Sequence, residues 1–341
     1  MRAIVCESLG DARQPLGTGV LKLDSNFPEP KLGKGMVRIS VAAASLNFPD
    51  ALQIKGEYQD KPPLPFVPGS EVSGVVAAVG EGVTSLAPGD KVCAVKQGGA
   101  FAESVVAPAG AVWRVPDAVP LEDAAAIPIV YGTADVALRH RAGLAAGQTV
   151  LVLGAAGGVG VAAVQLSRLA GARVVAVAAG KAKADFLKAQ GADAVIDTEA
   201  VAASGRALHV AIREAAPKGV NVVFDPVGGK QLFEALKSVA WGAQYLVIGF
   251  ASGDIPKVPA NLLLVKNATL HGVFWGSYMM HRPRVLADSM RQVLAWFAEG
   301  KLKVEVFARF PLDRVTDAFT VILDRSVRGK VLLTVGPQAR L

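Results

Sequence analysis

The pattern of hydrophobic and polar positions changes about a third of the way along the chain. Up to about residue 122, short apolar runs alternate with glycine- and proline-containing turns, which is typical of strands joined by loops. Residues 36–41 and 72–79 are the clearest predicted strands, and residues 47–55 predict a short helix. We therefore expect strands and turns to dominate this part.

From about residue 123 the pattern becomes a series of helices and strands. Residues 123–140 have helical spacing, and residues 149–153 form a continuous apolar strand followed by an Ala/Val/Leu helix over 159–170. Such alternation with short links predicts an α/β fold with a doubly wound parallel sheet. Further segments of the same kind are the strands 173–178, 194–197, 220–224, 244–248 and 269–274, the helices 182–190, 207–215, 231–239 and 283–299, and a strand–helix–strand tail over 304–335.

Composition limits the possible class of protein. The chain has 341 residues, of which 52% are hydrophobic, and this is enough for about two packed domains. Its net charge of +7 comes from scattered Lys and Arg, so it favours a phosphorylated cofactor over a nucleic-acid partner. Cys6 and Cys93 form no Cys-x-x-Cys pair, which favours a reducing, cytoplasmic compartment. Residues 142–167 lack charge, but six glycines favour a buried strand–turn–helix over a membrane span.

A glycine-rich turn lies between the strand at 149–153 and the helix that follows. The turn contains Gly154, Gly157 and Gly160, which have no side chains, so a pyrophosphate could approach the backbone closely. The helix N-terminus that follows would offer it free N–H groups. The usual spacing is Gly-x-Gly-x-x-Gly, so the first glycine departs from it. The strand–turn–helix context nevertheless predicts a nicotinamide-dinucleotide site, with Gly157, Gly158 and Val159 at the pyrophosphate.

The acid that would bind the ribose of NAD about twenty residues further on is missing. No Asp or Glu occurs between Val161 and Ala184. The strand ending at Ala178 is followed by Lys181 and Lys183, which are suited to a 2′-phosphate. This predicts NADP(H), although both lysines would also suit a solvated helix start.

Several motifs together resemble a known family. They are Asn47–Asp50, Gly56–Tyr58, Pro68–Gly74, Pro88–Val92, Tyr131–Ala134, Gly154–Gly160 and Asp225–Gly229. Over essentially its whole length the chain is similar to the medium-chain dehydrogenases/reductases, specifically the zinc-free quinone oxidoreductases that include zeta-crystallin. The resemblance implies a mainly β, GroES-like catalytic domain over residues 1–122, completed by about 300–341. It implies a Rossmann NADPH-binding domain over about 123–299.

The same resemblance implies that no metal is bound. Zinc-dependent relatives have Cys near the position of Asn47 and His at the position of Ser70, and they carry a four-cysteine loop that has no counterpart here. The four histidines, His140, His209, His271 and His281, have no ligand spacing. Without a Lewis acid, hydride transfer favours acceptors that are already electrophilic, such as quinones and α,β-unsaturated carbonyls.

The resemblance also suggests residues for the chemistry. Asn47 would lie near the nicotinamide, or would be a plain turn residue. Tyr58 would lie over the cleft, where it would donate a hydrogen bond to a developing oxyanion or form an apolar wall. Asp50 is a third catalytic candidate, and a helix-start carboxylate explains it equally well.

Other candidate cofactor ligands follow strands of the predicted sheet, where ligands bind in such folds. Asp225 is one of them, and a turn cap is its alternative. Arg328 and Lys330 are candidates for phosphate or for the surface. The remaining candidates are Thr133, Val227, Gly249, Phe250, Ala251, Phe274 and Trp275. The apolar segments 261–265 and 269–274 suggest a sheet edge that pairs in a homodimer, as the resemblance also implies.

Three functional hypotheses remain open. The leading one is NADPH-dependent reduction of a quinone. The second is reduction of the C=C bond of an α,β-unsaturated carbonyl or enoyl thioester. The third is a non-catalytic NADPH-binding protein, because some zeta-crystallin relatives have lens or RNA-binding roles.

Overall fold

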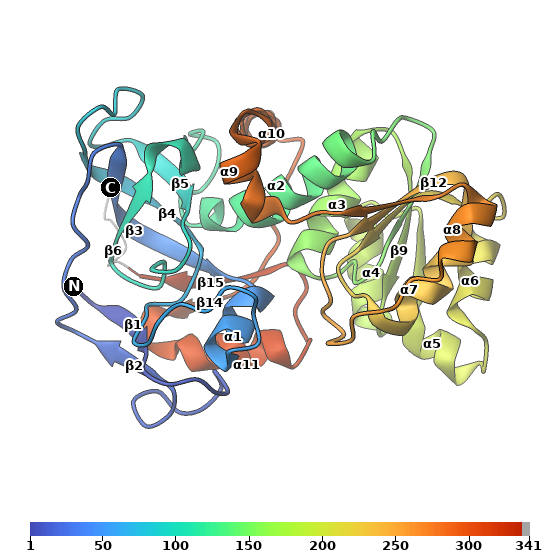
Figure 1. Ribbon diagram of the computed structural model, residues 1–341, viewed down its shortest axis with the longest axis horizontal. Coiled ribbons are helices and arrows are strands. Elements are labelled where there is room, and N and C mark those ends of the chain that lie inside the picture. Colours follow the sequence, from blue (N-terminus) through green and yellow to red (C-terminus); the bar gives the residue numbers. More distant parts are fainter. Residues whose placement is uncertain (336–341) are drawn as a thin grey trace. The chain divides into compact units, whose positions relative to one another are not determined.

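The chain folds into two compact units (Figure 1). The computed structural model describes residues 1–335. Unit 1 is residues 1–129 together with residues from 290 onward, and unit 2 is residues 130–289. The expected boundaries, at 122/123 and 299/300, lie seven residues before the first of these and ten residues after the second. The first and last segments of the chain, blue and red in Figure 1, thus share unit 1.

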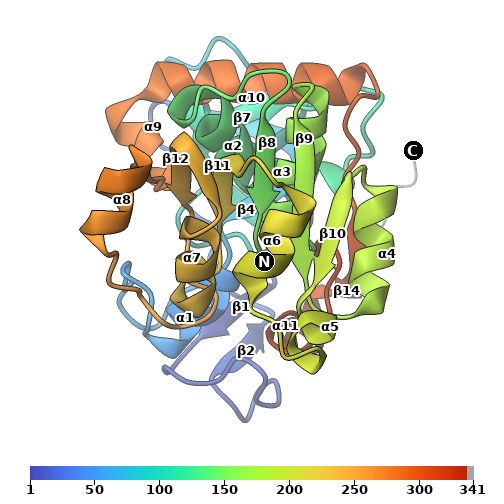
Figure 2. The ribbon, with the colours of Figure 1, turned by 90° about the vertical axis from the view of Figure 1, so that its right-hand side faces the viewer.

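Unit 2 is built on a six-stranded parallel sheet with helices packed against it (Figure 2). In chain order its strands are β8 to β13, and their spatial order is β10-β9-β8-β11-β12-β13. This is the doubly wound order 3-2-1-4-5-6, whose direction reverses between β8 and β11. The strands are β8 Thr149–Val152, β9 Arg173–Ala178, β10 Ala194–Asp197, β11 Val220–Asp225, β12 Val239–Val247 and β13 Thr269–Gly272.

Apolar residues explain why these strands lie inside. Val150, Leu151 and Val152 are completely buried, as expected for strands covered on both faces. The glycine-rich stretch 142–167 forms β8, a turn and α3, and no helix of the described residues is long and apolar enough to cross a membrane. The helices of this unit are α3 Gly158–Leu169, α4 Lys181–Ala189, α5 Thr198–Ala203, α6 Leu208–Ala215, α7 Gly229–Leu236, α8 Ala260–Lys266, the 3-10 turn η4 Trp275–Ser277 and α9 Tyr278–His281.

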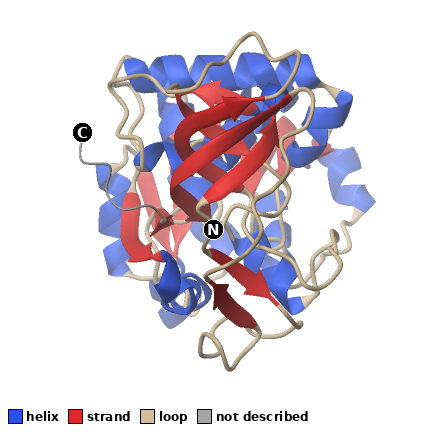
Figure 3. Cartoon of the chain, turned by 90° about the vertical axis from the view of Figure 1, so that its left-hand side faces the viewer, coloured by secondary structure: helices blue, strands red, loops and turns tan. Residues whose placement is uncertain are grey.

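Unit 1 holds a mixed seven-stranded sheet and a two-stranded sheet (Figure 3). The larger sheet has the order β14-β15-β3-β4-β5-β7, and β6 also pairs with β3. Its long strand β3 carries alternating buried positions, among them Val37, Ile39 and Val41. The strands are β1 Ala3–Cys6, β2 Leu21–Asp24, β3 Met36–Leu46, β4 Glu71–Val79, β5 Lys91–Val95, β6 Ser104–Pro108, β7 Val112–Arg114, β14 Val306–Pro311 and β15 Lys330–Thr334; the helices are α1 Phe48–Lys55 and α11 Val315–Leu323, with 3-10 turns η1 Ala109–Ala111, η2 Asp123–Ala126 and η5 Leu312–Arg314.

Two helices carry the chain between the units. These are α2, Pro128–Asp135, which continues into the π-helix η3, Val136–Arg141, and α10, Pro283–Ala298. The single helix predicted over 123–140 is therefore divided, with a break just before Pro128, as expected from a residue that suits a helix start.

One predicted edge element was wrong. Residues 261–265 lie in helix α8, where Leu264 and Val265 are 78% and 66% exposed. A run of four apolar residues has no detectable period, so it does not distinguish strand from helix. The two sheets otherwise confirm the predicted combination of a doubly wound Rossmann sheet and a GroES-like, mainly β domain.

Candidate functional site

The turn between β8 and α3 has the features of a phosphate cradle. Gly154 has φ 55°, a left-handed conformation that favours glycine. A Cβ on Gly160 would lie 2.5 Å from the carbonyl oxygen of Gly154, so only glycine lets α3 start this close to the strand. The first turn of α3 contains no acidic residue, and Gly157 is its N-cap. The free N–H groups of this turn, at Gly158 and Val159, lie at the point where the strand order reverses.

Two carboxylates from beyond Ala184 in the sequence lie beside Gly180, in the segment that follows β9. The N–H of Gly180 donates to Oδ1 of Asp197 at 2.8 Å. The Glu199 carboxylate lies 3.3 Å from the place where a Cβ on Gly180 would be. Asp197 ends β10, the neighbour of β9, and Glu199 follows in α5, so pairing of strands rather than sequence distance brings both acids here.

The two candidate lysines of α4 differ in their surroundings. The Lys181 side chain is 86% exposed, and its ammonium pairs with Asp185 at 2.6 Å, one turn further along the helix. Lys183 is half-buried in the same first turn. Ala178, at the end of β9, is buried. Lys181 therefore has a partner on its own helix. This favours its alternative interpretation, a solvated residue at the start of a helix.

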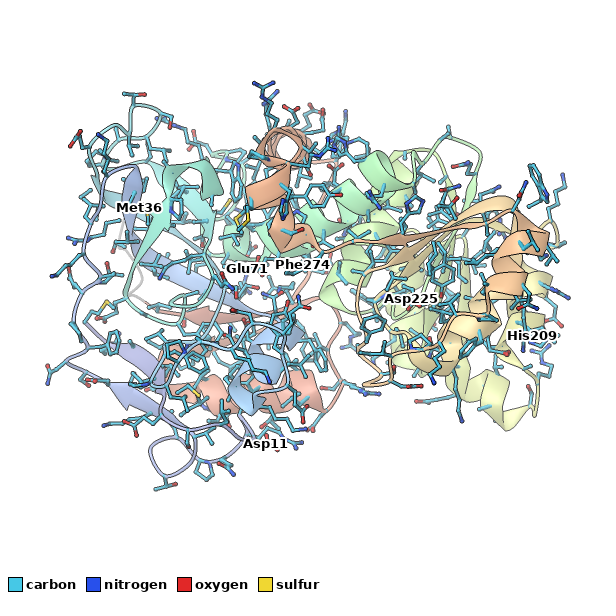
Figure 4. The ribbon with its side chains drawn as sticks, viewed as in Figure 1. Asp11, Met36, Glu71, His209, Asp225 and Phe274 are labelled. Carbon is cyan, nitrogen blue, oxygen red and sulfur yellow. The ribbon has the colours of Figure 1, made fainter. Side chains whose placement is uncertain are left out.

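Asp225 shapes the loop after β11. Its Oδ1 accepts hydrogen bonds from the N–H groups of Val227 and Gly228, both at 2.8 Å. Its Oδ2 accepts the Tyr245 hydroxyl at 2.8 Å. The side chain is completely buried, within unit 2 in Figure 4. The prediction of Asp225 as a direct cofactor ligand is therefore corrected: its Oδ1 holds the turn that presents Val227, and its Oδ2 is bonded to Tyr245 of β12.

The segment after β12 is tied to the same turn. The N–H of Ala251 donates to the carbonyl of Pro226 at 3.0 Å. Gly249 precedes Phe250, whose side chain is 37% exposed. The two predicted loops thus form one surface at the carboxyl ends of β11 and β12.

Phe274 and Trp275 have opposite environments. Phe274 is 56% exposed, whereas Trp275 is 5% exposed and lies against Gly132, where an added Cβ would be 2.8 Å from the indole. The indole Nε1 is buried without a partner among the described residues. Thr133, next to Gly132 in α2, is also buried. Trp275 therefore packs against α2, and its indole N–H is left as a buried hydrogen-bond donor.

In unit 1 three side chains form a buried polar cluster. The Lys330 ammonium donates to Oδ1 of Asn47 at 2.8 Å and to Oε1 of Glu71 at 3.0 Å, and to the carbonyl of Leu46 at 2.8 Å. Nδ2 of Asn47 donates to the same oxygen of Glu71 at 2.9 Å. The other oxygen of Glu71 accepts the N–H of Ile129 at 2.9 Å, at the start of α2. Glu71, which is labelled in Figure 4, is completely buried.

This cluster bears on two candidate residues, and it corrects the prediction for the first. All three ammonium hydrogens of Lys330 are used inside unit 1, so this residue is not free to bind phosphate. Both ends of the Asn47 amide are also engaged, so its orientation is fixed by Lys330 and Glu71. Glu71 was missed as a site residue. The available signal was a carboxylate directly before the predicted strand 72–79.

Asp50 is buried beside the cluster. Its Oδ2 accepts the backbone N–H of Asn47 at 2.7 Å, which caps α1, and its Oδ1 accepts the Ser70 hydroxyl at 3.2 Å. Burial raises the pKa of this carboxyl from 3.8 to about 7, although the hydrogen bond from Asn47 and the charge of Lys330 oppose the shift. Asp50 therefore has the capping geometry that was its alternative explanation.

Two further candidates lie in unit 1. Tyr58 is half-buried, and burial together with the charges of Asp50 and Asp60 raises the pKa of its phenol. This phenol is a hydrogen-bond donor at neutral pH. Arg328 stacks its guanidinium over the ring of Phe307, 5.4 Å from the centroid, which favours the surface alternative over a phosphate contact.

The described residues contain no group of three or more His, Cys, Asp or Glu side chains placed to hold a metal ion. His209 contacts Glu234 through Nδ1 at 2.8 Å, and His271 contacts Gln244 through Nε2 at 2.6 Å. Burial raises the pKa of Cys6 to about 11 and of Cys93 to about 12, so both thiols stay protonated at neutral pH.

A doubly wound sheet with a glycine turn at its switch point, within a chain whose outer segments form a GroES-like domain, is the architecture of a class of dehydrogenases and reductases. Two family models match the chain: an alcohol dehydrogenase GroES-like domain over residues 33–117 and a zinc-binding dehydrogenase domain over residues 158–299. A quinone oxidoreductase-like protein 2 homologue from Nematostella vectensis is 41% identical over 336 residues, spanning 97% of this chain and 88% of that protein.

Solved structures agree with this relationship. A probable oxidoreductase from Mycobacterium abscessus is 36% identical with a TM-score of 0.86, and 98% of each chain is covered. A mycobacterial protein complexed with NADPH is 31% identical with a TM-score of 0.88, covering 98% of this chain and 99% of that one. The chain therefore belongs to the medium-chain dehydrogenase/reductase superfamily and, within it, to the quinone oxidoreductase-like proteins.

Proposed function

We propose that this protein is an NADPH-dependent oxidoreductase that transfers a hydride to a quinone. The observation that carries the proposal is the cradle between β8 and α3, with Gly154 in a left-handed conformation and Gly160 packed against the strand. A helix N-terminus without an acidic residue is suited to a pyrophosphate. The mycobacterial relative complexed with NADPH supports the choice of cofactor.

The residues of unit 2 fit such a cofactor. The backbone N–H groups of Gly157, Gly158 and Val159 would hold the pyrophosphate, and Lys183 would face the 2′-phosphate. Further contacts are proposed from the loops after β9, β11 and β12 and from α2, at Ala178, Lys181, Val227, Gly249, Phe250, Ala251, Phe274, Trp275 and Thr133. When bound, NADPH supplies the hydride, and the protein positions it and keeps water away.

We propose that the reaction does not use zinc. Asn47 and Ser70 offer an amide and a hydroxyl, which are poor zinc ligands compared with Cys and His. The positive charge beside Glu71 is already supplied by Lys330, whose ammonium bonds both Glu71 and Asn47. A zinc ion placed among these groups would be repelled by the Lys330 ammonium, which already occupies the oxygens of Glu71 and Asn47 that could bind it.

Without a Lewis acid, the developing oxyanion needs a hydrogen-bond donor. Tyr58 is suited to this role because the carboxylates of Asp50 and Asp60 and partial burial keep its phenol protonated. The cluster of Asn47, Glu71 and Lys330 has a positioning role. Its hydrogen bonds hold the end of β3 and the start of α2 together. The net reaction adds one hydride and one proton to a quinone and gives a hydroquinone.

The same donor suits reduction of the C=C bond of an α,β-unsaturated carbonyl or enoyl thioester, our second candidate, because the hydride then yields an enolate that Tyr58 would stabilise. Oxidation of NADPH at 340 nm with 1,4-benzoquinone, 9,10-phenanthrenequinone and a simple enone separates the candidates. Faster turnover of quinones supports the first. Tight NADPH binding without turnover of any acceptor would instead favour a non-catalytic role.

We also propose a homodimer formed through β13. This strand stands at one edge of the six-stranded sheet, and an unpaired edge invites pairing with a second copy. Light scattering tests this directly, and a monomer at micromolar concentration contradicts it. The protonated thiols of Cys6 and Cys93 are compatible with a cytoplasmic location, which fluorescence microscopy of a tagged chain would test.

A further inference from the structure

A cavity of about 460 Å³ lies entirely within unit 1. This volume is in the range of small-molecule sites. Its wall is partly apolar, with Phe27, Pro62 and Phe66, and its polar lining includes Gln53, Asp60 and Lys96. Neither the cofactor site of unit 2 nor the buried cluster around Glu71 includes these residues.

Lys96 is held at this cavity by its own loop. It directly follows β5, and its backbone N–H donates to the carbonyl of Ser70 at 2.9 Å. The side chain folds back over Gly99, where an added Cβ would lie 2.7 Å from the ammonium nitrogen. Gly99 has φ 89°, so this position favours glycine for its backbone as well. The glycine makes room for the ammonium.

Among the residues that the structure describes, none supplies a counter-charge to the Lys96 ammonium. Within residues 1–335, its nitrogen has no carboxylate oxygen within 4.0 Å and no hydrogen-bond acceptor. Desolvation lowers the pKa of this half-buried side chain, and no neighbouring carboxylate offsets the shift. A partly buried ammonium without an anion is an unfavourable arrangement that a bound anion would relieve.

Two other lining residues, Gln53 and Asp60, connect the cavity to Tyr58, the proposed hydrogen-bond donor. Nε2 of Gln53, on α1, donates to Oδ2 of Asp60 at 3.0 Å. Asp60 is two residues beyond Tyr58, and its charge raises the pKa of the Tyr58 phenol. Asp60 has no such effect on Lys96. The lining therefore has a carboxylate at Asp60, which acts on Tyr58, and an ammonium at Lys96, and these opposite charges would orient a ligand with one anionic end.

We propose that this cavity binds the acceptor and that Lys96 pairs with a carboxylate on it, so that the protein prefers conjugated carbonyl compounds bearing a carboxylate over neutral ones. The apolar wall would hold the ring or chain of the acceptor. The anion would lie at Lys96 and the electrophilic end towards Tyr58. The proposal deepens the proposed function and relies on it for the reaction, but carboxylate binding at Lys96 does not require turnover.

The first test measures binding alone. Titration calorimetry measures the affinity of 2-naphthoate and of its neutral methyl ester. The proteins compared are the wild type, Lys96→Met and, as a control, Lys91→Met. Lys91 is the exposed first residue of β5, and its replacement by Met removes the same charge. We expect 2-naphthoate to bind about tenfold or more tightly than the ester, a preference lost in Lys96→Met and kept in Lys91→Met. Equal affinities in the wild type, or a preference that survives Lys96→Met, overturn the proposal.

The second test measures turnover with a carboxylated benzoquinone and its methyl ester. We expect Lys96→Met to raise KM for the acid about tenfold and to leave KM for the ester and kcat nearly unchanged. Lys96→Arg, which keeps the charge, should retain part of the preference, and thermal melting confirms that each variant is folded. Turnover of both quinones with no effect of Lys96→Met refutes the site and leaves the proposed function intact. Naphthoate binding through Lys96 without any turnover refutes the proposed function and leaves the site.

Discussion

The ammonium nitrogen of Lys330 lies 3.0 Å from Oε1 of Glu71, and the two side chains are 6% and 0% exposed. The residues begin β15 and β4, which lie on either side of β3, so the pair closes one end of the sheet where β3 passes into α1. Asn47, at this junction, bonds both members of the pair. A buried charge pair thus fixes the residue that the sequence motif identified.

Breaking this pair on one side should be far more costly than removing both charges. Lys330→Met leaves the Glu71 carboxylate buried with fewer donors, and we expect it to lower the free energy of unfolding by about 3–5 kcal/mol. The double variant Lys330→Met/Glu71→Gln should recover a large part of the loss. Urea denaturation measures both variants. Lys34→Met, which breaks an exposed pair with Glu81, is the control and should cost less than about 1 kcal/mol. A double variant as unstable as the single one would contradict this account.

Asp50 should make stability depend on pH. Burial raises its pKa from 3.8 to about 7, so between these values the folded state binds more protons than the unfolded state. Its contribution to stability is therefore present below pH 3.8 and is lost as pH rises to about 7. Asp50→Asn removes this slope, so its stability relative to wild type should increase by on the order of 2–4 kcal/mol from low to high pH. Asp117→Asn, at a fully exposed position, should change nothing in the same urea titrations. An unchanged slope in Asp50→Asn would show that another group titrates.

The sequence predicted those features whose cause is local. The strands of unit 2 and most of its longer helices follow from apolar periodicity, and the turn at Gly154 follows from short-range steric demands. The cluster in unit 1 could not be predicted in this way, because 259 residues separate Glu71 from Lys330. Pairing of strands brings them together. The three-residue strand β7 and the helix α8 were missed because short segments show too little periodicity.

The glycine turn offers a substitution that separates binding from folding. Gly157 has a negative φ, and an added Cβ would meet its nearest neighbour at 3.6 Å, so Gly157→Ala should fold normally. The methyl group would nevertheless stand where the backbone approaches the pyrophosphate. We expect Kd for NADPH, measured by fluorescence titration, to rise about tenfold. Gly110→Ala, whose Cβ would meet nothing within 4 Å, is the control. Unchanged affinity in Gly157→Ala would move the pyrophosphate away from this turn.

The coenzyme preference should depend on opposing charges beyond β9. Lys183 in the first turn of α4 would attract a 2′-phosphate, whereas Glu199, beside Gly180, would repel it. Lys183→Ala should raise KM for NADPH about tenfold with little effect on NADH, because one charge-assisted contact is lost. Glu199→Gln should lower KM for NADPH, since the repulsion disappears while Asp197 still holds the N–H of Gly180. Lys188→Ala, in the last turn of the same helix, controls for net charge. Equal changes with both coenzymes in Lys183→Ala would mean that this lysine does not contact the phosphate. A lower KM for NADH than for NADPH in the wild type would mean that Glu199 binds the ribose and that NADH is the reductant.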